Sequence, residues 1–271
     1  MRIRVSHQIV HRFAPPARTV NQILRLTPLS FDSQYVLRWR VGVDGDGAVR
    51  ESEDAHGNAV ASYSCHGLIE RVTIAAAGEV ETGDAAGVVK GAVERLPPQM
   101  YLRESPLAGV NGALRAFAAE ATQGAADPLD AMHRLMAAQH ETLPYHPDET
   151  DAAGSAIEAF ALGRGRARDF AHVFIACARW RGVPARFVTG YRAGGEGGQA
   201  GVHDWAEAHI PGLGWVAFDA TVPVCADDRY LRVAIGFDGQ DGAMIRSAHS
   251  GGEERVEAAV RVEQARAQSQ A

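Results

Sequence analysis

Two residues in the C-terminal half of the chain have the types and spacing of a catalytic base and its orienting acid. His203 lies at the start of the segment VHDWAEAHI, and Asp219 ends the next such segment, GWVAFD. Both segments have the composition of strands, so we expect the two side chains on neighbouring strands. A carboxylate beside a histidine fixes the tautomer of the imidazole, which can then take a proton from a nucleophile. The pair therefore predicts a nucleophilic triad that lacks only its third member.

The position where the nucleophile is expected holds an alanine. Residues 163–190 indicate a glycine-punctuated loop, an amphipathic helix that begins near Ala167, and a Gly-Val-Pro turn into a strand. The N-terminal end of a helix favours negative charge, which makes it a common place for a thiolate. Ala167 has no group that could attack a carbonyl, so we expect the covalent step to be absent.

The three cysteines are not expected to replace the missing thiol. Cys177 lies ten residues along the helix from Ala167, hence roughly 15 Å away and rotated by roughly 80°, and we predict that it is a core residue. Cys65 falls in an apolar strand, and nothing in the sequence places Cys225 against His203. So few cysteines, without the spacing of a metal site, fit a reducing cytoplasm.

Other patterns in this region have alternative interpretations. His203, Glu207 and His209 share one strand face and could be argued as a metal site, but Trp205 lies between them and no cysteine or aspartate converges. The glycine-rich segment 194–201 lacks the Gly-Lys-Ser/Thr of a phosphate-binding loop, so we expect a mobile hairpin loop at the rim. A His–Asp pair taken alone is more often a structural hydrogen bond than a catalytic one.

Two sets of elements are expected to position these residues. Residues 1–82 show period-2 alternation and β-branched residues between turn clusters such as Pro15–Pro16, which predicts a small antiparallel β-sandwich. Prolines break the chain between about 83 and 108, where we place the crossing between domains. The predicted division is an N-terminal β-sandwich domain over residues 1–100, a core domain over residues 101–265 and a flexible tail over residues 266–271.

The core domain is predicted to begin with helices and to end with strands. GALRAFAAEAT and PLDAMHRLMAAQHETL have apolar residues at helical spacing, and Asp127-Pro128 suits the start of the second helix. A loop and a short helix near 154–161 precede the central helix, in which residues 170, 174, 177, 178 and 181 define one buried face. The expected strands are ARFVTGYRA, VHDWAEAHI, GWVAFDAT, DRYLRVAIGF and ERVEAAVRVEQA.

Composition excludes some classes of function. The formal net charge of -6 and the pI near 6.0 argue against general nucleic-acid binding, which depends on basic patches. No apolar run approaches the ~20 residues that span a bilayer. The N-terminal residues MRIRVSHQIVHRF lack the apolar segment of a signal peptide, so we expect a cytoplasmic protein without membrane contact.

Four stretches, in this order, resemble the transglutaminase-like superfamily in its bacterial form with an N-terminal β-domain: GRGRARDFAHVFIA, GVPARFVTGY, HDWAEAHIPGLGWVAFDAT and DDRYLRVAIGFD. The family carries Gly-x-Cys-[Gln/Arg]-Asp-Phe-Ala-His at the helix start, then Gly-[Ile/Val]-Pro-Ala-Arg, His-Ala-Trp-x-Glu and Phe-Asp-Pro-Thr. The match covers nearly the whole chain. It implies an α+β fold, in which an N-terminal antiparallel β-sandwich precedes a papain-like core with its central helix packed on an antiparallel sheet.

The resemblance implies a role for each residue of the pattern. Ala167 stands at the position of the catalytic cysteine, His203 at the histidine and Asp219 at the aspartate. The family's thiolate attacks an amide or ester carbonyl, and water or an amine then takes the acyl group, so members are peptidases, amidases or transferases. We therefore expect a peptide or protein amide as the partner, with no cofactor and no metal. The residues expected to contact this partner are Arg166, Trp205 and His172.

Two hypotheses follow from the missing thiol. In the first, the chain is a natural pseudoenzyme that binds a peptide or amide-bearing partner in the former active-site cleft. Arg166 and Ala220, which replace a small or apolar residue and a proline, favour it, because an experimenter would have no reason to introduce them. Arg166 would also narrow the site or favour an anionic ligand. In the second, Ala167 is an engineered substitution in an active peptidase, amidase or acyl transferase, and the intact His203 and Asp219 favour it.

Overall fold

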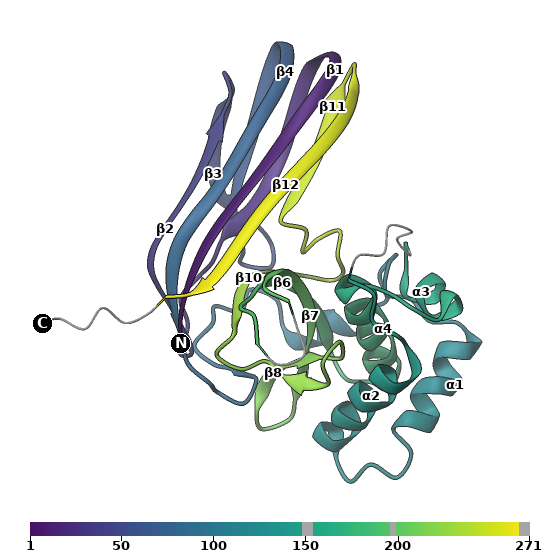
Figure 1. The fold of residues 1–271 in the computed structure, drawn as a ribbon. Helices are drawn as coiled ribbons and strands as arrows, with labels where there is room; N and C mark the ends of the chain where they lie inside the picture. Colours follow the sequence, from purple (N-terminus) through teal and green to yellow (C-terminus); the bar gives the residue numbers. More distant parts are fainter. Residues whose placement is uncertain (148–153, 196–198, 266–271) are drawn as a thin grey trace, which may run out of the picture.

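The computed structural model describes residues 1–147, 154–195 and 199–265 (Figure 1). Two antiparallel sheets of six strands each form the framework of this described part. The first sheet extends from the molecule as a tall slab, and the second sheet lies at its base with the helices beside it (Figure 1). This is the predicted α+β architecture.

Two long strands, β1 (Arg2–Thr27) and β4 (Ala59–Thr82), run antiparallel through the whole first sheet. Their register shifts between Arg12 and Thr19, beside the two prolines, so the predicted turn there is a bend within one continuous strand. On either side of the bend the strands have different neighbours and contribute to different layers of a sandwich. These neighbours are β2 (Gln34–Asp44), β3 (Ala48–Glu53), β11 (Ile245–Ser250) and β12 (Glu253–Gln264).

The last two strands belong to the sandwich and not to the core domain, where they were predicted. β12 pairs with residues 3–14 of β1, and β11 pairs with residues 19–24 of the same strand. In addition, β5 (Val88–Val89) from the predicted N-terminal domain pairs with β8 (Gly214–Asp219) of the second sheet. Periodicity identifies a strand but not its partner, so the single boundary near residue 100 is corrected. The predicted tail, residues 266–271, lies outside the described residues.

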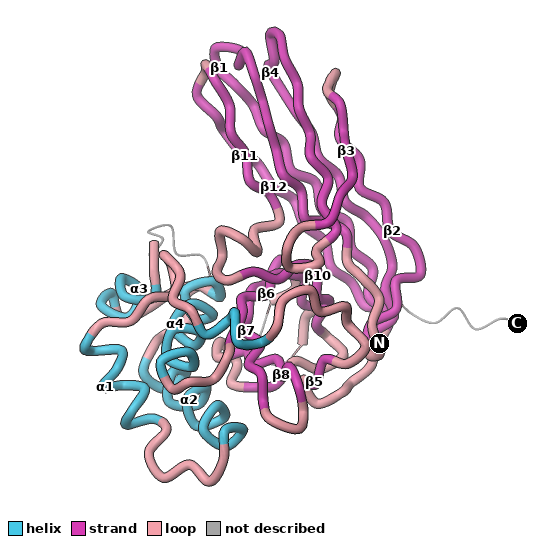
Figure 2. The backbone as a smooth tube through the Cα atoms, turned by 180° about the vertical axis from the view of Figure 1, so that it is seen from behind, coloured by secondary structure: helices cyan, strands magenta, loops and turns pink. Residues whose placement is uncertain are grey.

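The second sheet has the order β10 (Tyr230–Gly236), β6 (Ala185–Arg192), β7 (Gly201–Ile210), β8 (Gly214–Asp219) and β5, with β9 (Val224–Cys225) paired to β8. The helices α1 (Gly112–Ala121), α2 (Pro128–Thr142), α3 (Ala156–Leu162) and α4 (Ala167–Trp180) cover one face (Figure 2). The short 3-10 helix η1 (Pro98–Leu102) precedes them. On the other face, Tyr191 and Leu231 pack into the core of the sandwich.

The helix α4 is more deeply buried than its pattern predicts. Every residue from Asp169 to Arg179 is buried, because α1, α2 and α3 surround the helix on the sides that the sheet leaves open. Arg181, placed on the predicted apolar face, is exposed just after the helix. The helix ends where expected, with Gly182 in a left-handed conformation at φ 78°. Among the described residues, no helix combines the length and apolarity that a membrane span requires.

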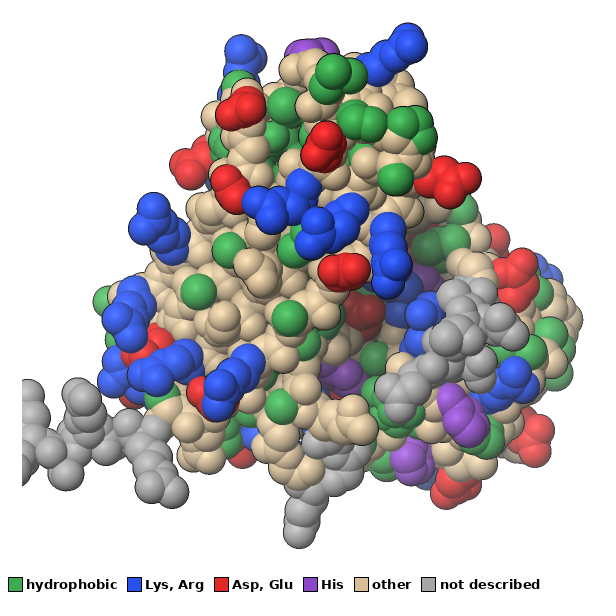
Figure 3. All heavy atoms as spheres, turned by 45° about the horizontal axis from the view of Figure 1, so that its top comes forward, with side chains coloured by type: hydrophobic (Ala, Val, Ile, Leu, Met, Phe, Trp, Pro, Cys, Tyr) green, Lys and Arg blue, Asp and Glu red, His purple; other side chains and the backbone are tan. Residues whose placement is uncertain are grey.

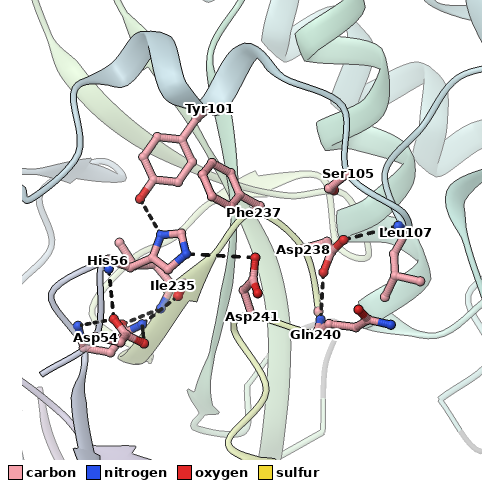
Figure 4. A network of polar contacts seen from close by, with 12 residues as sticks. Asp54, His56, Tyr101, Ser105, Leu107, Ile235, Phe237, Asp238, Gln240 and Asp241 are labelled. Atoms are coloured by element: carbon pink, nitrogen blue, oxygen red, sulfur yellow. Dashed lines mark hydrogen bonds and ion pairs between the residues drawn. The ribbon is translucent and has the colours of Figure 1, made fainter. Parts of the chain in front are cut away.

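A loop of the sandwich docks on the core and fixes the two parts relative to each other (Figure 4). The side chain of Asn58 donates to the carbonyl of Ile235 and accepts from its N–H, both at 2.8 Å. The ring of His56 lies between Tyr101 and Asp241, with its Nδ1 2.8 Å from the tyrosine hydroxyl. These buried contacts hold the sandwich at a defined position beside the second sheet.

Candidate functional site

The strands β7 and β8 bring His203 and Asp219 together as predicted. The imidazole Nε2 lies 2.6 Å from Asp219 Oδ2, and both side chains are buried, with 7% and 1% of their surface exposed. Because Asp219 engages Nε2, the remaining nitrogen, Nδ1, is the one left for a group in the adjacent cleft. Within the described chain, Nδ1 makes no hydrogen bond.

Asp219 is held in place by four hydrogen bonds. Its Oδ1 accepts from the backbone N–H and the hydroxyl of Thr221 at 2.9 and 2.7 Å, and its Oδ2 also accepts from the Tyr230 hydroxyl at 2.7 Å. Burial raises the pKa of Asp219, but His203, Thr221 and Tyr230 together outweigh it and keep that pKa below its usual value. The carboxylate is therefore charged and fixed, which is what orienting a histidine requires.

The start of α4 is shaped by a glycine and a local cap. The backbone N–H of Arg166 donates to Asp169 Oδ2 at 2.9 Å, so Asp169 caps the start of the helix. A Cβ at Gly165 would lie 2.7 Å from the Cβ of Asp169, so only glycine fits there. The carbonyl of Gly165 also accepts from His146 N–H at 2.9 Å. Ala167 is consequently the first residue of the helix.

Ala167 and His203 line the same open cleft, at the border between the core and the sandwich. Arg168 Nε lies 3.4 Å from Asp204 Oδ2, which joins the helix start to β7 beside this cleft. Figure 3 shows arginine and histidine side chains gathered at the border. The described lining residues are His7, Tyr145, Pro147, Arg166, Ala167, Arg168, Gln199, Ala200, Gly201, Val202, His203, Asp204, Ala258 and Val260. None of these residues is a cysteine, serine or threonine.

The three cysteines lie away from this cleft, as the sequence suggested. Cys177 is fully buried in α4, and burial raises the pKa of its thiol to about 12. Cys225 lies on β9, where burial raises the pKa of its thiol to about 11. Cys65 is a core residue of the sandwich. A protonated, enclosed thiol is a poor nucleophile, and none of the three cysteines lines the cleft beside Ala167.

Of the three residues predicted to contact a ligand, only Arg166 lines the cleft. Its Nε lies 3.8 Å from Asp169 Oδ2, and a third of its side chain is exposed. Trp205 is 2% exposed and lies parallel to the ring of His203, with the centroids 6.3 Å apart, so it supports the imidazole from the protein side. His172 is 0% exposed, and its Nε2 accepts from Gly239 N–H at 2.9 Å.

The predicted ligand contacts of Trp205 and His172 are therefore corrected. Burial lowers the pKa of His172 to about 3, which keeps it neutral inside the protein. Both residues belong to the motifs themselves, but neither side chain lines the cleft. They were placed in the site because the resemblance assigns both to its motifs, and a motif does not determine which way a side chain points.

The strand face considered for a metal ion is occupied by an ion-pair network. Glu207 is fully buried between Arg186 at 2.6 Å and Arg232 at 2.8 Å, and Arg186 also pairs with Glu94 at 2.6 Å. Across the ranges that the structure describes, no three His, Cys, Asp or Glu side chains are grouped to hold a metal. The glycine-rich segment predicted as a rim loop lies partly outside the described residues, since 196–198 are not described.

Sequence reasoning missed the wall that the sandwich contributes to the cleft. His7 on β1, and Ala258 and Val260 on β12, line it beside Ala167. Their only local signal is strand alternation, and His7 lies far from the core motifs in the sequence. Pairing of β1 with β12 and docking of the sandwich bring them to the site.

Comparison with known proteins identifies the family. Residues 115–220 match the model of the transglutaminase-like superfamily, and residues 3–81 match that of the bacterial transglutaminase-like N-terminal region. The chain belongs to the transglutaminase-like superfamily.

Relatives with this organisation occur in mycobacteria. An uncharacterized protein of Mycobacterium leprae is 26% identical over 270 residues, which cover 92% of this chain and 94% of that protein. An uncharacterized protein of Mycobacterium tuberculosis is 24% identical over 271 residues, covering 90% and 86% of the two chains. The crystal structure of a "putative cysteine protease" from Cytophaga hutchinsonii has a TM-score of 0.78 at 20% identity, covering 97% of this chain and 90% of that one. This transglutaminase-like chain therefore shares its fold with that protein.

Proposed function

We propose that this chain is a catalytically inactive transglutaminase-like protein that binds a peptide or another amide-bearing ligand in its cleft. The observation that carries the proposal is the composition of the cleft: Ala167 is the first residue of α4, and no described lining residue is a cysteine, serine or threonine. Acyl transfer by this family's route needs a thiol, and the described residues that line the cleft offer none. What the cleft retains is the ordered His203–Asp219 pair and an open surface for a ligand.

Restoring the thiol tests whether this cleft is a former acylation site. In the variant Ala167→Cys, His203 is expected to accept the thiol proton, so iodoacetamide should label this cysteine much faster than an ordinary exposed thiol. Adding His203→Ala should return the labelling rate to that of an ordinary thiol. The unchanged chain, with its buried cysteines, is the control. A folded Ala167→Cys variant that is labelled no faster than an ordinary thiol would contradict the proposed origin of the cleft.

A second candidate function is an active cysteine peptidase, amidase or acyl transferase in which Ala167 is an introduced substitution. The four hydrogen bonds around Asp219 favour it, because an idle site has no need to retain so complete an arrangement. The codon at position 167 of the source gene separates the two candidates. A cysteine codon would overturn the first candidate, and an alanine codon would overturn the second.

We also propose that the protein works in the cytoplasm. Its three cysteines are unpaired, which suits a reducing compartment. Fractionation of the source cells tests this, and recovery of the protein outside the cytoplasmic fraction would contradict it.

A further inference from the structure

One residue of the cleft comes from the sandwich and has no part in the His203–Asp219 pair. His7 lies on the inward face of β1 and is 6% exposed, yet it lines the cleft together with Ala167. Its cross-strand partner on β12 is Val260, and the next inward pair on these strands is Ile9 with Ala258. The wall of the cleft formed by the sandwich therefore presents one imidazole beside two small apolar side chains.

The environment of Tyr191 decides which nitrogen of His7 carries its proton. The tyrosine hydroxyl lies 3.0 Å from His7 Nδ1, and Tyr191 is 0% exposed on β6. In the described part of the chain this hydroxyl has no other acceptor. A buried hydroxyl that donates to nothing is costly, so Tyr191 donates to Nδ1. The neutral His7 then carries its proton on Nε2.

The charge state of His7 is consistent with this arrangement. Burial lowers the pKa of His7, so the ring is neutral at neutral pH. Its Nε2 makes no hydrogen bond within the described residues, and the ring lines the cleft. His7 therefore offers a ligand a single, fixed N–H donor.

We propose that His7 is a recognition residue that donates a hydrogen bond from Nε2–H to a carbonyl oxygen of the peptide bound in the cleft. Ala258 and Val260 contact the apolar atoms beside that oxygen. The carbonyl belongs to a carboxamide or to a carboxylate of the peptide, since both accept such a bond. This inference rests on the proposed function, namely that the cleft binds a peptide. It gives the N-terminal sandwich a direct part in ligand selection.

The first test measures the tautomer and needs no ligand. Two-bond 15N–1H correlation spectra of the labelled protein are expected to show His7 with its proton on Nε2. In Tyr191→Phe, which removes the donor to Nδ1, the other tautomer should become populated. A wild-type His7 protonated on Nδ1 would overturn the proposal.

The second test measures binding by calorimetry with two capped pentapeptides, Ala-Ala-Gln-Ala-Ala and Ala-Ala-Glu-Ala-Ala. The stronger probe shows whether the carbonyl is that of a carboxamide or a carboxylate. His7→Phe should weaken its binding by about tenfold, as expected for the loss of one hydrogen bond. His7→Gln, which keeps an N–H donor, should recover most of that loss. The matched control is His11→Phe, since His11 is also buried on the same face of β1 but does not line the cleft.

The outcomes separate this inference from the function on which it rests. If the wild type binds a peptide and a folded His7→Phe variant binds it equally well, the role of His7 is wrong and the proposed function stands. If the wild type binds neither peptide, both the proposed function and the recognition role are overturned, whatever the tautomer.

Discussion

At the scale of single residues, the site depends on which nitrogen of His203 faces the cleft. Asp219 Oδ2 holds Nε2, and Thr221 directs both of its donors to Oδ1. The side chain of residue 219 is therefore oriented independently of the histidine. His203 and His7 then present different groups to a ligand, because one exposes Nδ1 and the other Nε2–H.

This arrangement predicts the effect of Asp219→Asn. Because the two donors of Thr221 require an acceptor, the amide oxygen should replace Oδ1 and the amide N–H should point at His203 Nε2. The histidine should then carry its proton on Nδ1 and lose its ability to act as a base toward the cleft. In the Ala167→Cys background, iodoacetamide labelling should fall to the rate of an ordinary thiol, and 15N spectra should show the changed tautomer.

Tyr230→Phe is the matched control for that experiment. It removes one hydrogen bond from Asp219 Oδ2 but leaves the carboxylate beside His203. The labelling rate of Ala167→Cys should therefore remain high. Fast labelling in the Asp219→Asn variant would show that the carboxylate does not orient His203.

At the scale of elements, a buried ion-pair network joins three strands of the second sheet. Glu207 on β7 lies between Arg186 on β6 and Arg232 on β10, and Glu207 and Arg186 are fully buried. Taking the charges of such a network out of water costs free energy. Removing one partner is also strongly destabilising, because it leaves an unpaired buried charge. The strand that carries His203 is therefore tied to its neighbours by charge as well as by backbone hydrogen bonds.

We expect Glu207→Gln to lower the free energy of unfolding by about 3–5 kcal/mol, as for other broken buried ion pairs. Chemical denaturation measures this change. The control is Glu263→Gln, because the pair of Glu263 with Arg261 is exposed and such pairs contribute less than about 1 kcal/mol. If the two substitutions lowered the free energy of unfolding equally, the larger contribution expected of the buried ion pair would be contradicted.

The same pair gives a pH dependence with a definite sign. Burial raises the pKa of Glu207, but Arg232 and Arg186 outweigh it and lower that pKa below its usual value. A carboxyl with a lowered pKa in the folded state stabilises the protein above its unfolded pKa and loses this contribution as pH falls through the folded value. The stability difference between the wild type and Glu207→Gln should therefore shrink on acidification.

At the scale of the whole molecule, the end of the chain completes the sheet that begins it. β11 and β12 supply one edge of both sandwich layers, and Ala258 and Val260 of β12 also form part of the cleft. The N-terminal residues therefore cannot form the complete sandwich without the C-terminal ones. Figure 1 shows this meeting of purple and yellow strands.

A chain that ends at Met244 is expected to aggregate or unfold, because both halves of β1 lose a neighbour and expose an unpaired edge. Size-exclusion chromatography and thermal unfolding measure the effect. A chain that ends at Ala265 retains every described strand and serves as the control. A monomeric truncated chain with the stability of the control would show that the two strands are dispensable.

The sequence by itself determined the local helices and strands. It also determined the pairing of His203 with Asp219, because their two segments follow one another in the chain. The helix from Ala167, the strands that carry His203 and Asp219, and the absence of a thiol all follow from periodicity and residue type over short stretches. Only the tertiary structure decided that β12 pairs with β1, that His7 reaches the cleft, and that Trp205 and His172 face away from it. The physical reason is that local patterns fix which residues form a strand or helix, whereas partners distant in sequence are chosen by packing of the whole chain.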